Sequence, residues 1–166
     1  MTFDLKPISA AAIPDALQKA ERYRLLNEPS EAQSICEDIL LVAPQNQDAL
    51  VILLLAITDQ FDESASRREC REILPRIEDP YQRAYYSGIV SERLAKALLR
   101  SRRPGSNHSA YEALVEALRC FQQAEESRPE GNDDAILRWN TCARILMKNS
   151  ALQPRPEEHY REVVGE

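Results

Sequence analysis

Apolar residues recur at every third or fourth position along most of this 166-residue chain, which is the pattern of amphipathic helices. The clearest case is the segment 31–43, where one stripe carries Ala32, Ile35, Cys36, Ile39 and Leu40. Pro44 closes this helix, and a second apolar segment begins at Asp48 after a short polar turn. Similar stretches follow up to residue 149. The pattern predicts an all-α fold that is roughly three quarters helical and has no strands.

Prolines and short polar side chains mark where the helices begin and end. Pro14 fits the first turn of a helix, where its missing N–H costs nothing. Ser30 is expected to cap the helix that follows, and residues 132–134 (Asn-Asp-Asp) the last one. Pro75 predicts an early end for the helix before it. The segment 101–109 is expected to form a loop.

The apolar pattern partly repeats after 34 residues, since Cys36 is matched by Cys70 and Ile39 by Ile73. A helix-pair period of 34 is the mark of the tetratricopeptide repeat. With Ile13 as repeat position 1, small, aromatic, small, apolar and proline residues occupy positions 8, 11, 20, 27 and 32, namely Ala20, Tyr23, Ala32, Ile39 and Pro44. The chain therefore resembles the tetratricopeptide repeat family.

A third repeat resembles the family with an insertion. Gly88 falls on the small position 8, and Ala117, Phe121, Ala124 and Pro129 keep the later spacings. Gly88 and Ala117 are 29 residues apart where the family layout gives about 12, so both helices of this pair are expected to be long. Glycine inside a helix costs about 1 kcal/mol relative to alanine. We expect Gly88 to allow close approach of a neighbouring helix, and we expect Phe121 to be buried.

The resemblance implies a right-handed superhelical stack of antiparallel helix pairs, a tetratricopeptide-like α-solenoid. It divides the chain into an N-terminal arm (1–12), a repeat domain (13–148, with units 13–46, 47–79, 80–131 and 132–148), and a C-terminal linker with a short capping helix or tail (149–166). In the family, the first helix of each pair lines a concave groove that binds proteins. The matching positions here are Arg24, Leu55, Thr58, Asp59, Tyr85, Ile89, Glu92, Arg93, Asn140 and Arg144.

Each groove residue also has a plainer interpretation. Tyr85 fits a core or inter-repeat position, and Glu92 and Arg93 could pair with charges on adjacent helices, which contributes about 0 to 1 kcal/mol at a surface. The register of the last helix is open by one residue, so Arg138 could face the groove instead of its neighbours.

Composition limits the classes of partner. The net charge is −6, with 29% charged and 43% hydrophobic residues, which disfavours nucleic-acid binding because no surplus of lysine and arginine displaces counterions. The longest apolar run, 49–57, is far below the ~20 residues that span a bilayer. The start of the chain lacks the layout of a signal peptide. We therefore expect a cytoplasmic protein that binds neither nucleic acid nor membrane.

No cluster of residues has the spacing of a metal, cofactor or catalytic site. The four cysteines form no CxxC pair and are interpreted as buried apolar residues, with a redox role as the alternative; they are Cys36, Cys70, Cys120 and Cys142. The arginines at 100, 102 and 103 fit a solvated helix end, with an anion or phosphoprotein site as the alternative.

The sequence therefore predicts a non-enzymatic scaffold or adaptor that binds a peptide or protein segment in its concave groove. One alternative is an oligomerisation module that forms a homodimer through an exposed apolar end of the stack. A second is a regulatory subunit of an enzyme complex. The identity of the partner is not encoded in any motif.

Overall fold

All regular structure in the described residues is helical. The computed structural model describes residues 3–61, 64–101 and 103–155, and within them helices account for 76% with no strand. The α-helices are α1 (Ile13–Leu25), α2 (Pro29–Val42), α3 (Gln47–Asp59), α4 (Ser64–Ile73), α5 (Pro80–Ser101), α6 (Ser106–Glu126) and α7 (Asp134–Lys148), with short 3-10 turns at Ala10–Ala12 and Leu74–Arg76. The predicted all-α fold and its helix content are confirmed.

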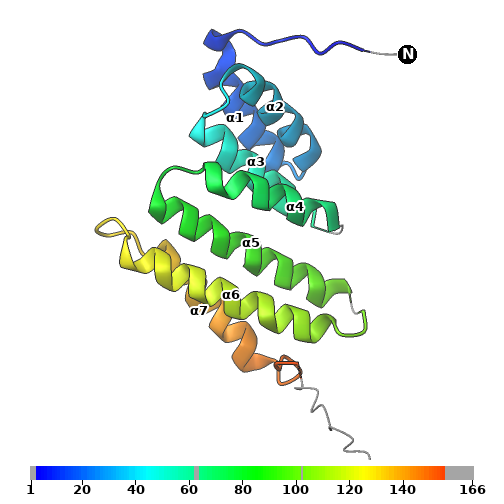
Figure 1. Cartoon of the computed structure of the whole chain (residues 1–166), viewed down its shortest axis with the longest axis vertical. Helices are drawn as coiled ribbons and strands as arrows, with labels where there is room; N and C mark the ends of the chain where they lie inside the picture. Colours follow the sequence, from blue (N-terminus) through cyan, green and yellow to red (C-terminus); the bar gives the residue numbers. More distant parts are fainter. Residues whose placement is uncertain (1–2, 62–63, 102, 156–166) are drawn as a thin grey trace, which may run out of the picture.

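The helices follow one another along the long axis of the molecule, from α1 and α2 at one end to α7 at the other (Figure 1). Helices that are neighbours in the chain pack together as α1 with α2, α2 with α3, α3 with α4, α5 with α6, and α6 with α7. In addition, α1 contacts α3 and α3 contacts α5, so alternate helices also lie side by side. The helix pairs fall within the predicted units, and α7 occupies the last one.

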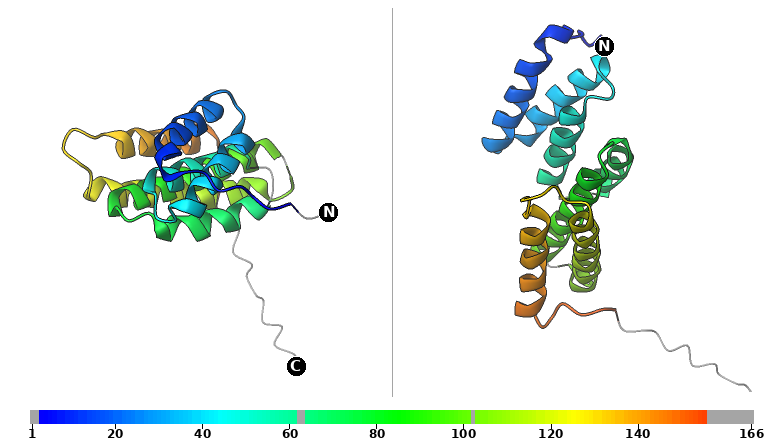
Figure 2. Two further views of the ribbon diagram at one scale, coloured as in Figure 1. Left: turned by 90° about the horizontal axis from the view of Figure 1, so that it is seen from above. Right: turned by 90° about the vertical axis from the view of Figure 1, so that its left-hand side faces the viewer.

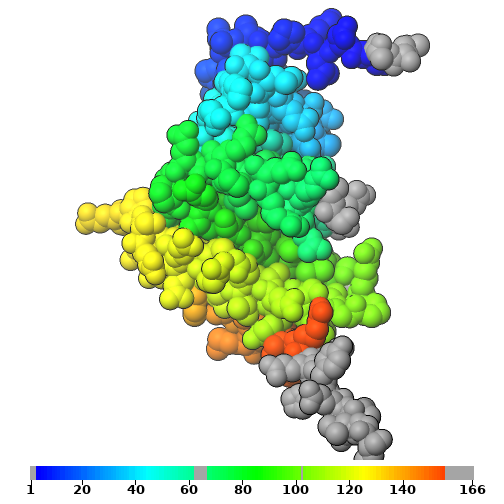
Figure 3. Space-filling model, in the orientation of Figure 1, coloured from blue at the N-terminus to red at the C-terminus, as the bar shows by residue number. Residues whose placement is uncertain are grey.

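The two ends of the molecule differ. Residues 3–9 run out from the first helices without regular structure, whereas Ala10–Ala12, the last part of the predicted arm, form a 3-10 turn against α1 (Figure 2). At the other end the described chain leaves α7 through residues 149–155, and the predicted capping helix at 156–166 lies outside the described residues. The segment between α6 and α7 projects from the side of the stack (Figure 3).

The helix boundaries agree with the sequence at the start of α1 and at the end of α4, and they differ at the start of α2. Pro14 lies in the first turn of α1, and α4 ends early at Ile73, before the 3-10 turn that contains Pro75. The expected Ser30 cap is wrong, because α2 already begins at Pro29, and its N-cap Glu28 makes no side-chain cap bond. Pro29 is itself pre-organised for the first turn, so the helix starts one residue before Ser30.

Residues 132–134 stabilise the start of α7 in a different way from the expected cap. Asp133 occupies the N-cap position without a side-chain cap bond, whereas Asn132 Oδ1 accepts from Asp134 N at 2.9 Å and from the Tyr81 hydroxyl at 3.2 Å. Asn132 thus links the α6–α7 connection to the first turn of α5.

The predicted loop 101–109 is shorter than expected. α5 extends to Ser101 and α6 begins at Ser106, so residues 106–109 are helical, and His108 lies on α6 rather than in a loop. Its Nδ1 lies 3.0 Å from the Gln153 carbonyl oxygen. Serine and asparagine are common at helix starts, and this polar first turn therefore resembles a loop in the sequence.

The long pair α5 and α6 forms the centre of the molecule. The two helices have 22 and 21 residues, as the inserted third repeat predicts, and they pack along their length. Gly88 faces the fully buried ring of Phe121, and a Cβ atom on residue 88 would come within 2.5 Å of that ring. Both expectations are confirmed: Gly88 allows the close approach, and Phe121 is core.

The four cysteines are buried free thiols, as predicted. Burial raises the pKa of Cys36, Cys70 and Cys142 to about 12 and that of Cys120 to about 11, because a thiolate is poorly solvated in an apolar interior. In the described ranges, no helix combines the length and the apolar character needed to cross a membrane.

Candidate protein-binding surface

Charged side chains from three helices meet on one face of the molecule. Arg24 of α1 donates through Nε to Asp59 Oδ2 of α3 at 2.9 Å. Arg93 of α5 donates to Asp59 Oδ1 at 2.5 Å, to Thr58 Oγ1 at 2.6 Å and to the Leu55 carbonyl oxygen at 3.1 Å. One carboxylate therefore joins α1, α3 and α5, and all five of these residues were predicted as groove residues.

This network is half-buried. The side chains of Arg24, Asp59 and Arg93 retain 20%, 26% and 27% of their accessible surface. Each side chain therefore connects two helices and is still partly exposed to solvent. Burial lowers the pKa of Arg93, and the Asp59 carboxylate opposes that shift. Two guanidinium groups on one carboxylate leave an excess positive charge at the surface.

A second charged cluster joins α5 to α7. Glu92 is only 1% exposed, and its Oε1 accepts from Lys96 of the same helix and from Arg138 of α7 at 3.4 Å. Its Oε2 has no hydrogen-bond partner among the described residues. Lys96 and Arg138 keep 38% and 42% of their side-chain surface, so the two cations cover a buried acid and still face solvent.

Arg138 also decides the register of α7. The sequence placed Asn140 and Arg144 in the same groove as Tyr85 and Arg93, which requires them to continue the line of groove residues on α5, and it left Arg138 as the alternative. The structure places Arg138 against α5. At about 100° per residue, Asn140 and Arg144 lie about 200° and 120° around the helix from it, away from α5. The continuous line is therefore wrong for these two residues, and Arg138 takes their place.

An aromatic group lies beside the charged clusters. Tyr85 is half-buried, stacks on Tyr81 with a centroid distance of 5.9 Å, meets Tyr86 edge-on at 5.2 Å, and contacts Phe121 at 5.8 Å. These contacts make Tyr85 in part a packing residue, and whether its accessible part contacts a partner stays a prediction.

The eight predicted groove residues on α1, α3 and α5 divide into two sets. Thr58, Ile89 and Glu92 are 4%, 3% and 1% exposed, so their side chains pack in the interior or form internal hydrogen bonds and ion pairs, and they are not part of the outer surface. Arg24, Leu55, Asp59, Tyr85 and Arg93 are accessible and lie together on α1, α3 and α5. Whether they bind a partner stays a prediction.

Two residues of this face were missed by the sequence reasoning. Lys96 follows Glu92 by four residues, the spacing of a helical ion pair, and this signal was available. Arg138 was recognised only as a register alternative. Arg138 and Lys96 are added to the accessible set to define a candidate protein-binding surface, referred to below as the protein-binding surface. Its residues are Arg24, Leu55, Asp59, Tyr85, Arg93, Lys96 and Arg138.

Nothing in the described part of the chain gathers three or more histidine, cysteine, aspartate or glutamate side chains into a metal-binding arrangement. Comparison of the chain with protein-family models, with curated proteins and with solved structures finds no match. The resemblance to the tetratricopeptide repeat therefore rests on residue spacing alone.

Proposed function

We propose that this protein is a non-enzymatic scaffold that binds an acidic segment of another protein along the protein-binding surface. We further propose that its helix pairs form a tetratricopeptide-like superhelical stack, with α1, α3, α5 and α7 as the groove-lining helices. The observation that carries the proposal is the convergence of Arg24, Asp59 and Arg93 from three helices onto one half-exposed network. Such a surface exists only when the helices are stacked.

The charge of this surface defines the chemistry of the partner. Four cations, Arg24, Arg93, Lys96 and Arg138, face two carboxylates, Asp59 and Glu92, of which Glu92 is buried. The surface thus has a local excess of about two positive charges in a chain whose net charge is −6. An acidic segment would be attracted to this face and repelled by the rest of the molecule.

Tyr85 and Leu55 supply the apolar part of the surface. Both are half-buried and pack beside the charged network. Aromatic residues and arginines carry a disproportionate share of interface energy, about 2 kcal/mol or more at a central anchor. A partner with a large apolar side chain flanked by acids fits this arrangement best.

The lysines of the chain allow the surface to be tested directly. The partner is first isolated by affinity capture on the full chain and then joined to it with an amine-reactive cross-linker. Lys96 belongs to the protein-binding surface, whereas Lys19 is on the exposed side of α1 and Lys148 at the end of α7. We expect cross-links at Lys96. Cross-links confined to Lys19 or Lys148 would contradict the proposal.

A pair of variants measures the contribution of charge. Arg24→Gln should lower the affinity for the captured partner by about tenfold. Asp59 keeps its hydrogen bond from Arg93 in this variant, so the free energy of unfolding should change by less than about 1 kcal/mol. Arg22→Gln is the matched control, because Arg22 is an exposed arginine of the same helix outside the surface. Equal affinities for the two variants would refute the role of the charged network.

A second candidate, self-association through the ends of the stack, is supported by exposed apolar side chains on the last described helix. Leu137 and Met147 of α7 are 62% and 84% exposed. Sedimentation of the purified chain separates the two candidates. A stable dimer that Met147→Lys dissociates would favour self-association, and a monomer would favour the scaffold. Capture of an enzyme would make the chain a regulatory subunit.

A further inference from the structure

The part of the sequence that follows the described residues, 156–166, has the chemistry of the partner that suits the protein-binding surface. It holds four glutamates and one arginine, a charge of about −3, which is half of the net charge of the chain. Tyr160, Val163 and Val164 add apolar side chains at spacings of three and four, as on one face of a helix. The chain thus carries its own acidic segment with large apolar side chains.

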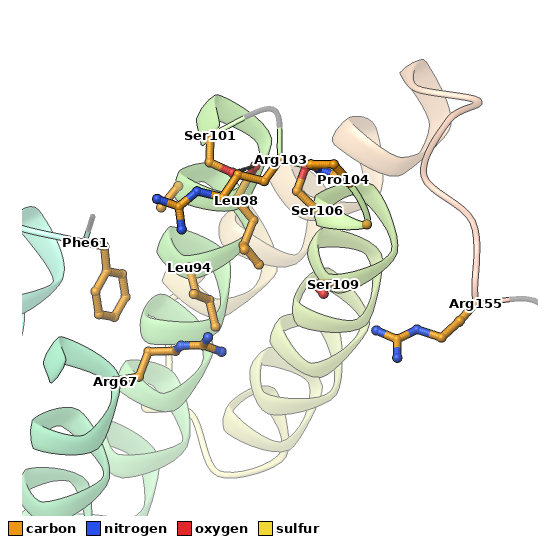
Figure 4. Close-up of a pocket in the computed structure, with 12 residues that line it drawn as sticks. Phe61, Arg67, Leu94, Leu98, Ser101, Arg103, Pro104, Ser106, Ser109 and Arg155 are labelled. Carbon is orange, nitrogen blue, oxygen red and sulfur yellow. Dashed lines mark hydrogen bonds between the residues drawn. The ribbon is translucent and has the colours of Figure 1, made fainter. Parts of the chain in front are cut away.

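The structure brings the start of this segment to the end of α5. The residues after α7 reach the first turn of α6, where His108 Nδ1 lies 3.0 Å from the Gln153 carbonyl oxygen. Arg155 borders the hollow of about 560 Å³ at the α5–α6 turn, together with Ser101, the last residue of α5 (Figure 4). The segment 156–166 is therefore attached beside the C-terminal end of α5.

The cations of the protein-binding surface on α5 lie within reach of that attachment point. Arg93 and Lys96 are three residues apart, so they are neighbours on the helix surface. At 1.5 Å per residue, Lys96 lies about 8 Å and Arg93 about 12 Å along the axis from the end of α5. An extended chain carries Glu158 up to about 10 Å and Tyr160 up to about 17 Å beyond the last described residue. The order of acids and apolar residues in the segment therefore fits the surface.

Lys96 and Arg138 have the hydrogen-bonding capacity to bind these acids. Both donate to the same oxygen of the buried Glu92, its Oε1, and they keep 38% and 42% of their side-chain surface. An ammonium group carries three N–H donors and a guanidinium group five, so each cation can bind a second carboxylate without releasing Glu92. Leu55, whose carbonyl oxygen accepts from Arg93, provides a partly accessible apolar side chain beside these charges.

We propose that the segment 156–166 binds the protein-binding surface of its own chain and competes there with the partner. Its first glutamates bind Lys96 and Arg138. Tyr160 packs against Leu55. This inference rests on the proposed function, because it uses the same surface and the same partner chemistry.

The short tether makes even weak binding of the segment effective. Tethering by a short linker gives an effective concentration of about 1 mM, so a segment with an intrinsic Kd of about 0.1 mM occupies its own surface about nine tenths of the time. A competing ligand then finds about one tenth of the surfaces open, and its apparent affinity is about tenfold lower. Removing the acids of the segment should restore that affinity.

Fluorescence anisotropy of a labelled synthetic peptide with the sequence of residues 153–166 tests the proposal on the full chain. The triple variant Glu157→Gln, Glu158→Gln, Glu162→Gln removes the acids from the chain's own segment. We expect it to bind the peptide about tenfold more tightly than the native chain does. Equal affinities, or no binding of the peptide to either chain, would overturn the proposal.

A second triple variant is the matched control for net charge. Glu125→Gln, Glu126→Gln, Glu130→Gln removes the same charge from exposed side chains at and after the end of α6. We expect this variant to bind the peptide as the native chain does. A gain equal to that of the first triple variant would reduce the effect to net charge and overturn the proposal.

Arg138→Gln, added to the first triple variant, locates the binding site of the peptide. We expect the peptide affinity to fall about tenfold, the usual effect of losing a charged donor, whereas Arg22→Gln on the exposed side of α1 should leave it unchanged. Melting curves check that the variants are folded, and if Arg138→Gln is not, Arg24→Gln takes its place. An unchanged affinity would put the segment elsewhere, such as the end of the stack, and overturn the proposal.

Sedimentation of the native chain separates binding within one chain from binding to a second copy. We expect a monomer, and a dimer that the first triple variant dissociates would overturn the proposal. The peptide titrations use no partner, so the two proposals fail separately. A partner that responds to Arg24→Gln while the peptide does not bind would overturn this inference alone. Peptide binding that follows the expected pattern, with a partner insensitive to Arg24→Gln, would support this inference and contradict the proposed function.

Discussion

Replacing Gly88 by alanine sets helix propensity against packing, and the structure predicts that packing dominates. Gly88 has ordinary helical geometry within α5, so alanine should stabilise an isolated helix by about 1 kcal/mol. The new Cβ atom, however, would lie 2.5, 2.7 and 2.8 Å from three ring carbons of Phe121. Ordinary carbon contacts lie near 3.5–4.0 Å, so the ring has to move by about 1 Å.

Phe121 has little room to make that movement. Its side chain is fully buried, and the Tyr85 ring lies 5.8 Å from its own. Overpacking of a dense core typically costs about 1 to 3 kcal/mol, and a displacement of this size belongs in the upper part of that range. After subtraction of the helix gain, we expect Gly88→Ala to destabilise the protein by about 1 to 2 kcal/mol.

Urea denaturation followed by circular dichroism measures this change. Ser87→Ala, one residue earlier on the same helix and away from Phe121, is the control for propensity, and we expect a change within about 0.5 kcal/mol. Phe121→Leu should cost less in the Gly88→Ala background than in the native one, with a coupling of about 1 to 2 kcal/mol. A Gly88→Ala variant more stable than the native chain, or additive with Phe121→Leu, would refute the close contact.

Three further predictions concern the core and its thiols. Phe121→Ala should lower the free energy of unfolding by about 3 to 5 kcal/mol in the same urea assay, through lost apolar transfer and the cavity left behind, and a loss below about 1 kcal/mol would mean that the residue is misplaced. Thiols in the unfolded chain ionise above about pH 9, whereas the buried thiols stay protonated to about pH 11 or 12. Between these pH values the unfolded state binds fewer protons than the folded state. The free energy of unfolding therefore falls as the pH rises from about 9 to 12. Thermal melts from about pH 8 to 10.5 should show that fall, with a shallower slope in Cys36→Ala; an equal slope would exclude this thiol as a cause. Since the cysteines are free and buried, neither a reductant nor a chelator should move the melting temperature, and a drop of many degrees would indicate a disulfide or a metal.

The sequence predicted the helices well because their signals are local. Apolar spacing and prolines define α1, α2 and α3 to within one or two residues. The repeat register placed Gly88 where a neighbouring helix comes close and Phe121 in the interior, and the structure brings these two residues into contact. The helix start at Ser106 was missed, because serines and an asparagine in a first turn look like a loop when the apolar stripe begins only at Ala110.

The site was less predictable because exposure depends on tertiary packing. The repeat pattern placed Ile89 and Glu92 on the groove floor, yet both are buried by neighbouring helices. It left α7 uncertain by one residue, which the pairing of Arg138 with Glu92 resolves.

The division of the core along the chain has a consequence for synthesis on the ribosome. The buried residues of the first core lie between Ala20 and Ile77, and those of the second between Ile89 and Leu152. α5 contributes to both, because its partly buried side chains Val90 and Leu94 close the first core and its buried Ile89 and Ala95 belong to the second. Leu55 of α3 also packs against the second core. The N-terminal half can therefore complete its own interior once α5 has emerged, while α6 and α7 are still being translated. The nascent protein needs to shield only one unfinished apolar surface, the side of α5 that awaits Phe121.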